Sequence, residues 1–185
     1  MTVFEKISPD NTEKALTLAV RRAAELDTDM VLATSTGASA YAALDMSVKM
    51  NFTGRVVAVT SVWGSKNQNE NYMTRDEFDK LAKAGAILVT AGHALSGVER
   101  SLSRKFNGTY PVEIISHTLR MICEGMKVCV EICAMAMDAG MVEPKRPVVA
   151  LGGTGRGLDT ACVVTPGYSA GIFDTRVHEI LCKPR

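Results

Sequence analysis

The chain has 185 residues, 46% of them apolar and 22% charged, and its 21 basic and 20 acidic residues leave a formal net charge of +1. This length and composition are typical of one globular domain, which we place over residues 1–185. A net charge so close to zero gives no bulk electrostatic reason to expect binding to nucleic acid or to an anionic membrane.

The N-terminal residues and the cysteines predict a cytoplasmic protein. Residues 1–6 hold no apolar secretory segment, and no apolar run approaches the roughly 20 residues that span a bilayer. The five cysteines have no framework spacing, which is typical of reduced thiols. Cys129 and Cys133 share one helix face, but no CxxC pair accompanies them, so we favour buried structural thiols and expect no metal.

The first strands and helices alternate. Residues 1–4 predict a short edge strand, and Asp10 or Asn11 caps a helix with an apolar face at helical spacing. Residues 30–33 form a short apolar run, which is typical of a buried parallel strand. A second helix is expected over about 38–50.

The middle of the chain continues this alternation. Residues 56–60 predict the next strand. Thr74 and Glu77 form a capping box that begins a helix, and Gly85 stands where a left-handed C-cap would end it. Residues 86–89 predict a third strand.

The second half predicts a long helical block and a group of strands. The helical block covers about 110–140 and is divided near Gly125, and its second part is apolar nearly all round, which indicates a buried helix. The loop between strands 147–151 and 161–164 is too short for a crossover helix, so we expect these strands to be antiparallel neighbours. Residues 177–182 predict a final edge strand. The alternating order favours an α/β fold, a mainly parallel sheet with helices on both faces.

Open α/β sheets bind ligands at the carboxyl ends of their strands, and the segment Thr34-Ser35-Thr36-Gly37 lies at such an end before a helix. Free N–H groups and the helix dipole attract an anion there, the three hydroxyls add donors, and the glycine allows close approach. Plain helix capping explains the same residues equally well.

A glycine-rich loop, residues 152–157, follows the strand at 147–151. Its glycine spacing and the strand after it exclude a dinucleotide fingerprint, and it lacks the ending of a nucleotide P-loop. Its N–H groups together with Arg156 can wrap an anion, although a hairpin turn is the simpler interpretation. Asp159 and Thr160 can reach the same crevice.

Residues 92–101 follow the third main strand and are crowded with charge, which by itself indicates a solvated face. His93 is more often a structural histidine than a catalyst, although its place at a strand end favours a role in the site. Glu131 lies inside the apolar helix, and we favour a structural pair with Lys127. Trp63 can stack on a planar ring.

Together, several of these segments resemble one family. Residues 11–13, 35–37, 93–101, 127–132 and 152–161 occur in the order found in stand-alone proteins related to the pyruvate kinase C-terminal α/β domain. The resemblance covers almost the whole chain, and the segments 93–101 and 152–161 are its specific part. It implies a three-layer α/β/α sandwich around a mixed, mostly parallel sheet with one antiparallel strand.

The resemblance also implies a ligand. The corresponding Ser/Thr loop of pyruvate kinase grips a phosphate of a sugar-bisphosphate effector, and stand-alone members resemble binders of flavin mononucleotide (FMN). FMN is therefore the cofactor we expect. The expected binding residues from the loops and the resemblance are Thr34, Ser35, Thr36, Gly37, Ser39, Thr60, His93, Ser96, Arg100, Gly153, Thr154, Gly155, Arg156, Asp159 and Thr160.

Two departures from pyruvate kinase limit what is carried over. Its chemistry belongs to a (β/α)₈ barrel of roughly 250 residues, for which this chain has no room. Residues 61–64 also lack the histidine expected after the second main strand, so no role of that histidine is assigned here.

These observations predict a binding protein for a phosphate-bearing small molecule, either FMN or a related phosphorylated metabolite, without pyruvate kinase activity. The alternative is a flavin-dependent oxidoreductase, with His93 or Arg100 near a reactive ring. A third interpretation is a structural subunit whose methionine-rich helices, residues 121–141, form an oligomer interface. We expect a homo-oligomer.

Overall fold

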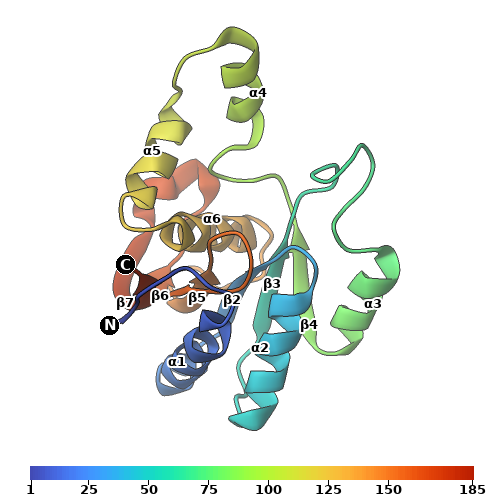
Figure 1. Cartoon of the computed structure of the whole chain (residues 1–185), viewed down its shortest axis with the longest axis vertical. Coiled ribbons are helices and arrows are strands. Elements are labelled where there is room, and N and C mark those ends of the chain that lie inside the picture. Colours follow the sequence, from blue (N-terminus) through green and yellow to red (C-terminus); the bar gives the residue numbers. More distant parts are fainter.

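Seven strands form one sheet in the order β1-β7-β6-β5-β2-β3-β4 in the computed structural model, which describes residues 1–185 (Figure 1). The strands are β1 Thr2–Phe4, β2 Met30–Thr34, β3 Val56–Thr60, β4 Ala86–Thr90, β5 Val148–Gly152, β6 Thr160–Thr165 and β7 Arg176–Pro184. β6 is antiparallel to both of its neighbours, and all other neighbours are parallel. The predicted mixed sheet with one antiparallel strand is confirmed.

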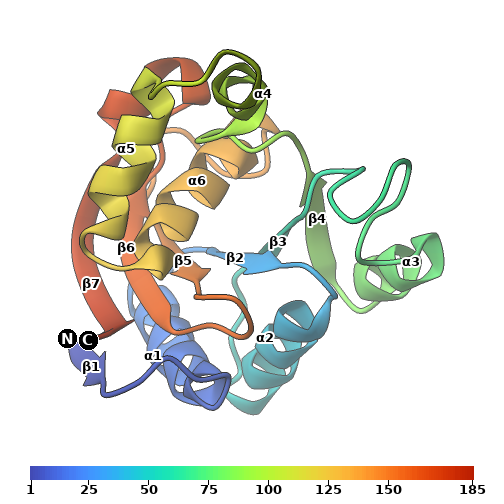
Figure 2. The same cartoon turned by 45° about the horizontal axis from the view of Figure 1, so that its top comes forward.

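Helices cover both faces of the sheet. They are α1 Asn11–Glu25, α2 Ala38–Lys49, α3 Arg75–Lys83, α4 Gly97–Phe106, α5 Pro111–Arg120 and α6 Glu124–Asp138, with a 3₁₀ helix at Ser169–Asp174. α1 and α2 lie on one face and α6 on the other, with α5 packed outside α6 (Figure 2). The expected three-layer α/β/α sandwich is therefore present.

Each face of the sheet carries its own hydrophobic core, because successive side chains of a strand point to opposite faces. Met30 and Leu32 of β2 pack with Leu16 of α1, whereas Val31 packs with Met126 of α6. This two-sided burial explains why the strands are continuous apolar runs rather than alternating ones.

The methionines of α6 belong to the inner core and not to an exposed interface. Met126, Met135 and Met137 are each at most 2% exposed. The interpretation of these methionines as an oligomer interface is therefore wrong, although Met121, before α6, is exposed. None of the helices combines the length and the hydropathy needed to cross a membrane.

Three details of the element order differ from the sequence prediction. β7 is an interior strand, because β1 pairs along its outer side. The helical block is divided at residues 121–123, and Gly125 lies in the first turn of α6. The helix α4 was not predicted, because none of its side chains is buried and its charges suggested a solvated loop.

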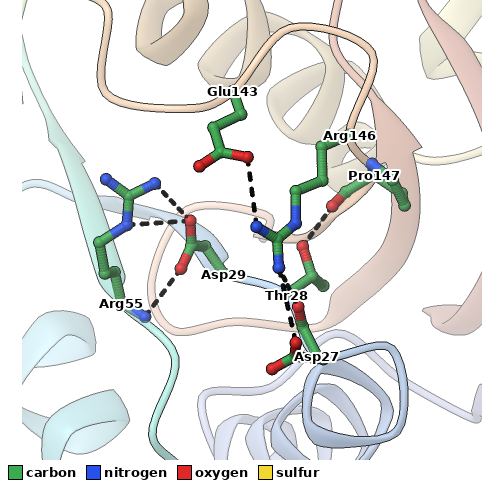
Figure 3. A network of polar contacts seen from close by, with 7 residues as sticks. All are labelled: Asp27, Thr28, Asp29, Arg55, Glu143, Arg146 and Pro147. Atoms are coloured by element: carbon green, nitrogen blue, oxygen red, sulfur yellow. Dashed lines mark hydrogen bonds and ion pairs between the residues drawn. The ribbon is translucent and has the colours of Figure 1, made fainter.

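A polar network ties the chain together at the amino edge of the sheet (Figure 3). The carboxylate of Asp29, just before β2, accepts hydrogen bonds from the Arg55 backbone N at 2.9 Å and from its Nε at 3.0 Å and Nη2 at 2.6 Å. Thr28 donates to the carbonyl of Pro147, and Arg146 donates to the carbonyl of Asp27. The segments before β2, β3 and β5 are thereby joined.

We expect Asp29→Asn to lower the free energy of unfolding by about 1 kcal/mol at pH 7. Burial opposes ionisation of Asp29, but the bonds from Arg55 outweigh it and hold the pKa of the carboxyl below its ordinary value. A lowered folded pKa gives stability that is present above about pH 4 and is lost as the pH falls through the folded pKa. Urea denaturation should therefore show a smaller difference from the parent protein at pH 3 than at pH 7. Asp79→Asn, at an exposed carboxylate without an ion pair, is the control, and an equal loss in both variants would contradict the prediction.

Candidate functional site

A cleft of about 810 Å³ opens at the carboxyl edge of β2, β3 and β5. One wall is α6, and the other walls are the loops after β2, β3, β4 and β5 together with the start of α1. The residues that line it are Pro9, Thr12, Ala33, Thr34, Ser35, Thr36, Ala38, Ser39, Val59, Thr60, Ser61, His93, Val128, Glu131, Ile132, Met135, Gly153, Gly155, Arg156 and Gly157.

The loop between β2 and α2 forms one end of the cleft. The N–H of Gly37 donates to Thr34 Oγ1 at 3.1 Å, which fixes the turn, and the hydroxyl side chains of Ser35 and Thr36 are exposed. Gly37 adopts φ +88°, and a Cβ there would lie 3.0 Å from Leu81 Cδ1, so only glycine fits without strain. The first N–H groups of α2, which have no partner within the helix, point into this turn and favour an anion.

The glycine-rich loop after β5 forms the facing wall. Asp159 anchors it by accepting hydrogen bonds from Thr154 N at 3.1 Å and from Thr160 Oγ1 at 2.7 Å. Leu158 N donates to Thr12 Oγ1 at 3.0 Å, which joins the loop to the start of α1. Arg156 is exposed at the cleft without an ion pair to any carboxylate of the chain, so its guanidinium is free to meet a bound anion.

A buried carboxylate lies in the α6 wall. Glu131 forms an ion pair with Lys127, accepts a hydrogen bond from Leu95 N at 3.0 Å, and lies 3.4 Å from His93 Nδ1. Burial opposes its ionisation, but the contacts with His93 and Lys127 outweigh burial and lower the pKa of Glu131 to about 2. Burial also lowers the pKa of Lys127, against the opposing effect of Glu131. The predicted structural pair is present, and it also supports a histidine of the cleft.

The structure gathers most of the expected binding residues around this one cleft. Those that line it are Thr34, Ser35, Thr36, Ser39, Thr60, His93, Gly153, Gly155 and Arg156. Those outside its lining are Gly37, Ser96, Arg100, Thr154, Asp159 and Thr160. Gly37 and Asp159 shape the two loops, whereas Ser96 and Arg100 belong to the start of α4.

Other residues of the cleft were not singled out as binding residues from the sequence. Val128, Ile132 and Met135 give α6 an apolar face toward the cleft, but the sequence of α6 is apolar nearly all round, so no pattern marks that face. Trp63 does not line the cleft. Its ring lies 6.1 Å from that of Phe78 and carries the guanidinium of Arg75 at 5.0 Å, so it packs within the chain.

A match to a protein family agrees with this architecture. Residues 13–164 match the family described as pyruvate kinase, alpha/beta domain. The crystal structure of Cryptosporidium parvum pyruvate kinase is similar at 14% sequence identity with a TM-score of 0.40. The likeness covers 89% of this chain and 24% of that one, so the present chain spans about a quarter of that enzyme. With a family match over residues 13–164 of 185, the chain belongs to the pyruvate kinase alpha/beta domain family.

Proposed function

We propose that the chain binds a phosphate-bearing small molecule, with the phosphate on the loop between β2 and α2. The observation that carries this proposal is the meeting of Ser35, Thr36 and Ser39 with Arg156 around one cleft at the start of a helix. Hydroxyl and N–H donors, the helix dipole and a guanidinium all favour an anion. In this proposal the loop binds the phosphate in addition to beginning α2.

The rest of the cleft suits a planar apolar group. Its volume of about 810 Å³ lies within the range of small-molecule sites, about 300–1,000 Å³. Val128 of α6 offers an accessible apolar side chain, with the buried Ile132 and Met135 behind it. We therefore propose FMN, or a related phosphorylated metabolite, as the ligand, with its ring along α6.

We attach no pyruvate kinase activity to these residues. The structure is one open seven-stranded sheet, whereas a (β/α)₈ barrel closes eight parallel strands in roughly 250 residues. The proposed function is binding, and it needs none of that barrel.

Replacing Ser35 and Thr36 together by alanine is expected to weaken FMN binding by about 10- to 100-fold, because two hydrogen bonds to a charged group are lost. Both side chains are exposed, so the free energy of unfolding should change by less than about 0.5 kcal/mol. Calorimetric titration with FMN, preceded by a visible spectrum of the freshly purified protein, measures this.

The matched control is Thr53→Ala/Ser65→Ala, which removes two exposed hydroxyl groups outside the cleft. Equal FMN affinity in the Ser35/Thr36 variant and the parent protein would refute the phosphate position. A colourless protein that also fails to bind added FMN would remove FMN as the ligand.

A flavin-dependent oxidoreductase remains the second candidate, and the presence of His93 in the cleft favours it. A bound flavin would supply the redox chemistry, while the protein would orient its ring and place the imidazole beside it. One experiment distinguishes a binding protein from an enzyme. The protein is loaded with FMN and reduced, and candidate electron acceptors are then added. Reoxidation that depends on an acceptor and is faster than that of free FMN indicates an enzyme.

We also propose that the protein is cytoplasmic, because its five unpaired cysteines favour a reducing compartment.

We further propose that the chain associates with copies of itself. The helices α4 and α5, which extend from the sheet at the top of Figure 1, carry exposed apolar side chains, and such patches often mark interaction surfaces. The exposed apolar side chains of α4 and α5 are Val98, Leu102, Phe106 and Ile114, and Met121 and Ile122 directly after α5 are exposed too.

Light scattering is expected to give a mass of at least twice 19.9 kDa for the parent protein and the monomer mass for Val98→Asp. A carboxylate in the middle of an apolar contact is costly to desolvate. Val48→Asp on α2 is the control, because Val48 and Val98 are 78% and 79% exposed. A monomeric parent protein would end this proposal.

A further inference from the structure

The carboxylate of Glu131 is held by three donors from two segments, its own helix α6 and the loop after β4. Its Oε1 accepts from Leu95 N, and its Oε2 contacts Lys127 Nζ of the same helix and His93 Nδ1 from the loop after β4. Glu131 is 3% exposed, whereas the side chain of His93 is 33% exposed and lines the cleft. Lys127 alone is enough to balance the charge of Glu131 in a structural ion pair. The additional contact between Glu131 and His93 therefore points to a second role.

The charge of Glu131 decides which nitrogen of His93 carries the proton. A pKa of about 2 keeps the carboxylate ionised at neutral pH, and an ionised carboxylate only accepts hydrogen bonds. Nδ1 must therefore carry the hydrogen that faces it. A neutral imidazole has one N–H, so Nε2 is left with a lone pair, and it has no hydrogen-bond partner within the chain.

We propose that Glu131 is a positioning residue that fixes the tautomer of His93, so that the cleft presents a hydrogen-bond acceptor at Nε2 and selects a ligand with an N–H or O–H donor. This inference rests on the proposed function and narrows its ligand class. β4 lies two strands from β2, and neighbouring strands are 4.7–4.9 Å apart, so the two strand ends are roughly 10 Å apart. The ligand is a phosphate compound with a hydroxyl, amide or imide group remote from the phosphate.

The first test measures the tautomer in the free protein by ¹⁵N NMR of the imidazole groups at pH 8. His93→Asn identifies the signal of His93 among the three histidines. We expect Nδ1–H and unprotonated Nε2 in the parent protein. In Glu131→Gln, the side-chain amide NH₂ can donate to Nδ1, so the proton should move to Nε2.

If Glu131 had only a structural role, Glu131→Gln would not move the proton of His93 from Nδ1 to Nε2. If Glu131→Gln does not fold, Lys127→Met/Glu131→Gln removes the unpaired ammonium and allows the same measurement. A parent protein with Nε2–H, or the same tautomer with glutamate and glutamine at position 131, would overturn the proposal.

The second test uses FMN and inorganic phosphate as probes in calorimetry. Asparagine at position 93 keeps a donor near Glu131 but has no atom in the place of Nε2. We expect His93→Asn to weaken FMN binding about 5- to 10-fold, the value of one hydrogen bond, and to leave phosphate binding unchanged. Ser35→Ala/Thr36→Ala should weaken both.

The two variants separate the two proposals. Unchanged FMN affinity in His93→Asn, with both probes weakened in Ser35→Ala/Thr36→Ala, overturns the role of His93 and leaves the phosphate position intact. If neither probe binds the parent protein, the proposed function fails, and the NMR result alone decides the role of Glu131.

Discussion

Lys127→Met is expected to lower the free energy of unfolding by about 3–5 kcal/mol, the usual cost of removing one partner of a buried ion pair. Lys127 and Glu131 are 5% and 3% exposed. After the substitution Glu131 keeps only the donors of His93 and Leu95, so its charge is poorly compensated in a low-dielectric environment. Urea denaturation at pH 7 measures the loss.

The matched control for this variant is Lys80→Met, which breaks the ion pair with Asp76. That pair has the same spacing of four residues, but its side chains are 63% and 72% exposed, so water screens it and its loss should cost far less than the loss of Lys127. Lys127→Met/Glu131→Leu should recover part of the stability, because no buried charge remains. Equal effects of Lys127→Met and Lys80→Met would contradict the prediction.

The same pair gives a pH dependence. The folded pKa of Glu131, about 2, lies below its ordinary value of 4.5. Its contribution to stability is therefore fully present well above the ordinary value and is lost as the pH falls through the folded pKa.

Gly125→Ala is expected to lower the free energy of unfolding by about 2–3 kcal/mol, in the upper part of the range for overpacking. The added Cβ would lie 2.1 Å from Thr160 Oγ1 and 2.5 Å from Thr160 Cβ. Alanine normally stabilises a helix interior by about 0.5–1 kcal/mol relative to glycine, which is too little to offset this collision. The first turn of α6 must move away from β6.

Thermal or urea unfolding checks this prediction, with Gly92→Ala as control, since no atom lies within 4 Å of a Cβ at Gly92. Because α6 also carries Glu131 and the apolar wall of the cleft, FMN affinity should fall together with stability. A Gly125→Ala protein as stable as the parent protein would show that α6 accommodates the methyl group without moving.

Much of the fold follows from local patterns. The capping box at Thr74 and Glu77 forms both of its hydrogen bonds, and Gly85 adopts φ +105° after α3. The short loop between β5 and β6 does produce an antiparallel pair, because no crossover helix fits there. These features need only a few neighbouring residues, so the sequence determines them.

The tertiary structure decided the rest. β7 lies inside the sheet because β1, which is far away in sequence, pairs with its outer side. The residues near β7 in the sequence do not indicate this pairing. Gly125 was interpreted as a break in a helix, yet it marks close packing of α6 against β6. α4 was missed because it buries no side chain, so the burial that reveals most helices is absent.

By itself, the sequence determined that Ser35, Thr36, His93 and Arg156 lie at the carboxyl edge of a mainly parallel sheet, because each follows a recognisable strand. Only the tertiary structure decided that they share one cleft and that Glu131, besides its predicted pair with Lys127, also faces His93. The physical reason is that a partner one helical turn away can be read from local spacing, whereas the further donors depend on the packing of α6 against a loop 36 positions earlier in the chain.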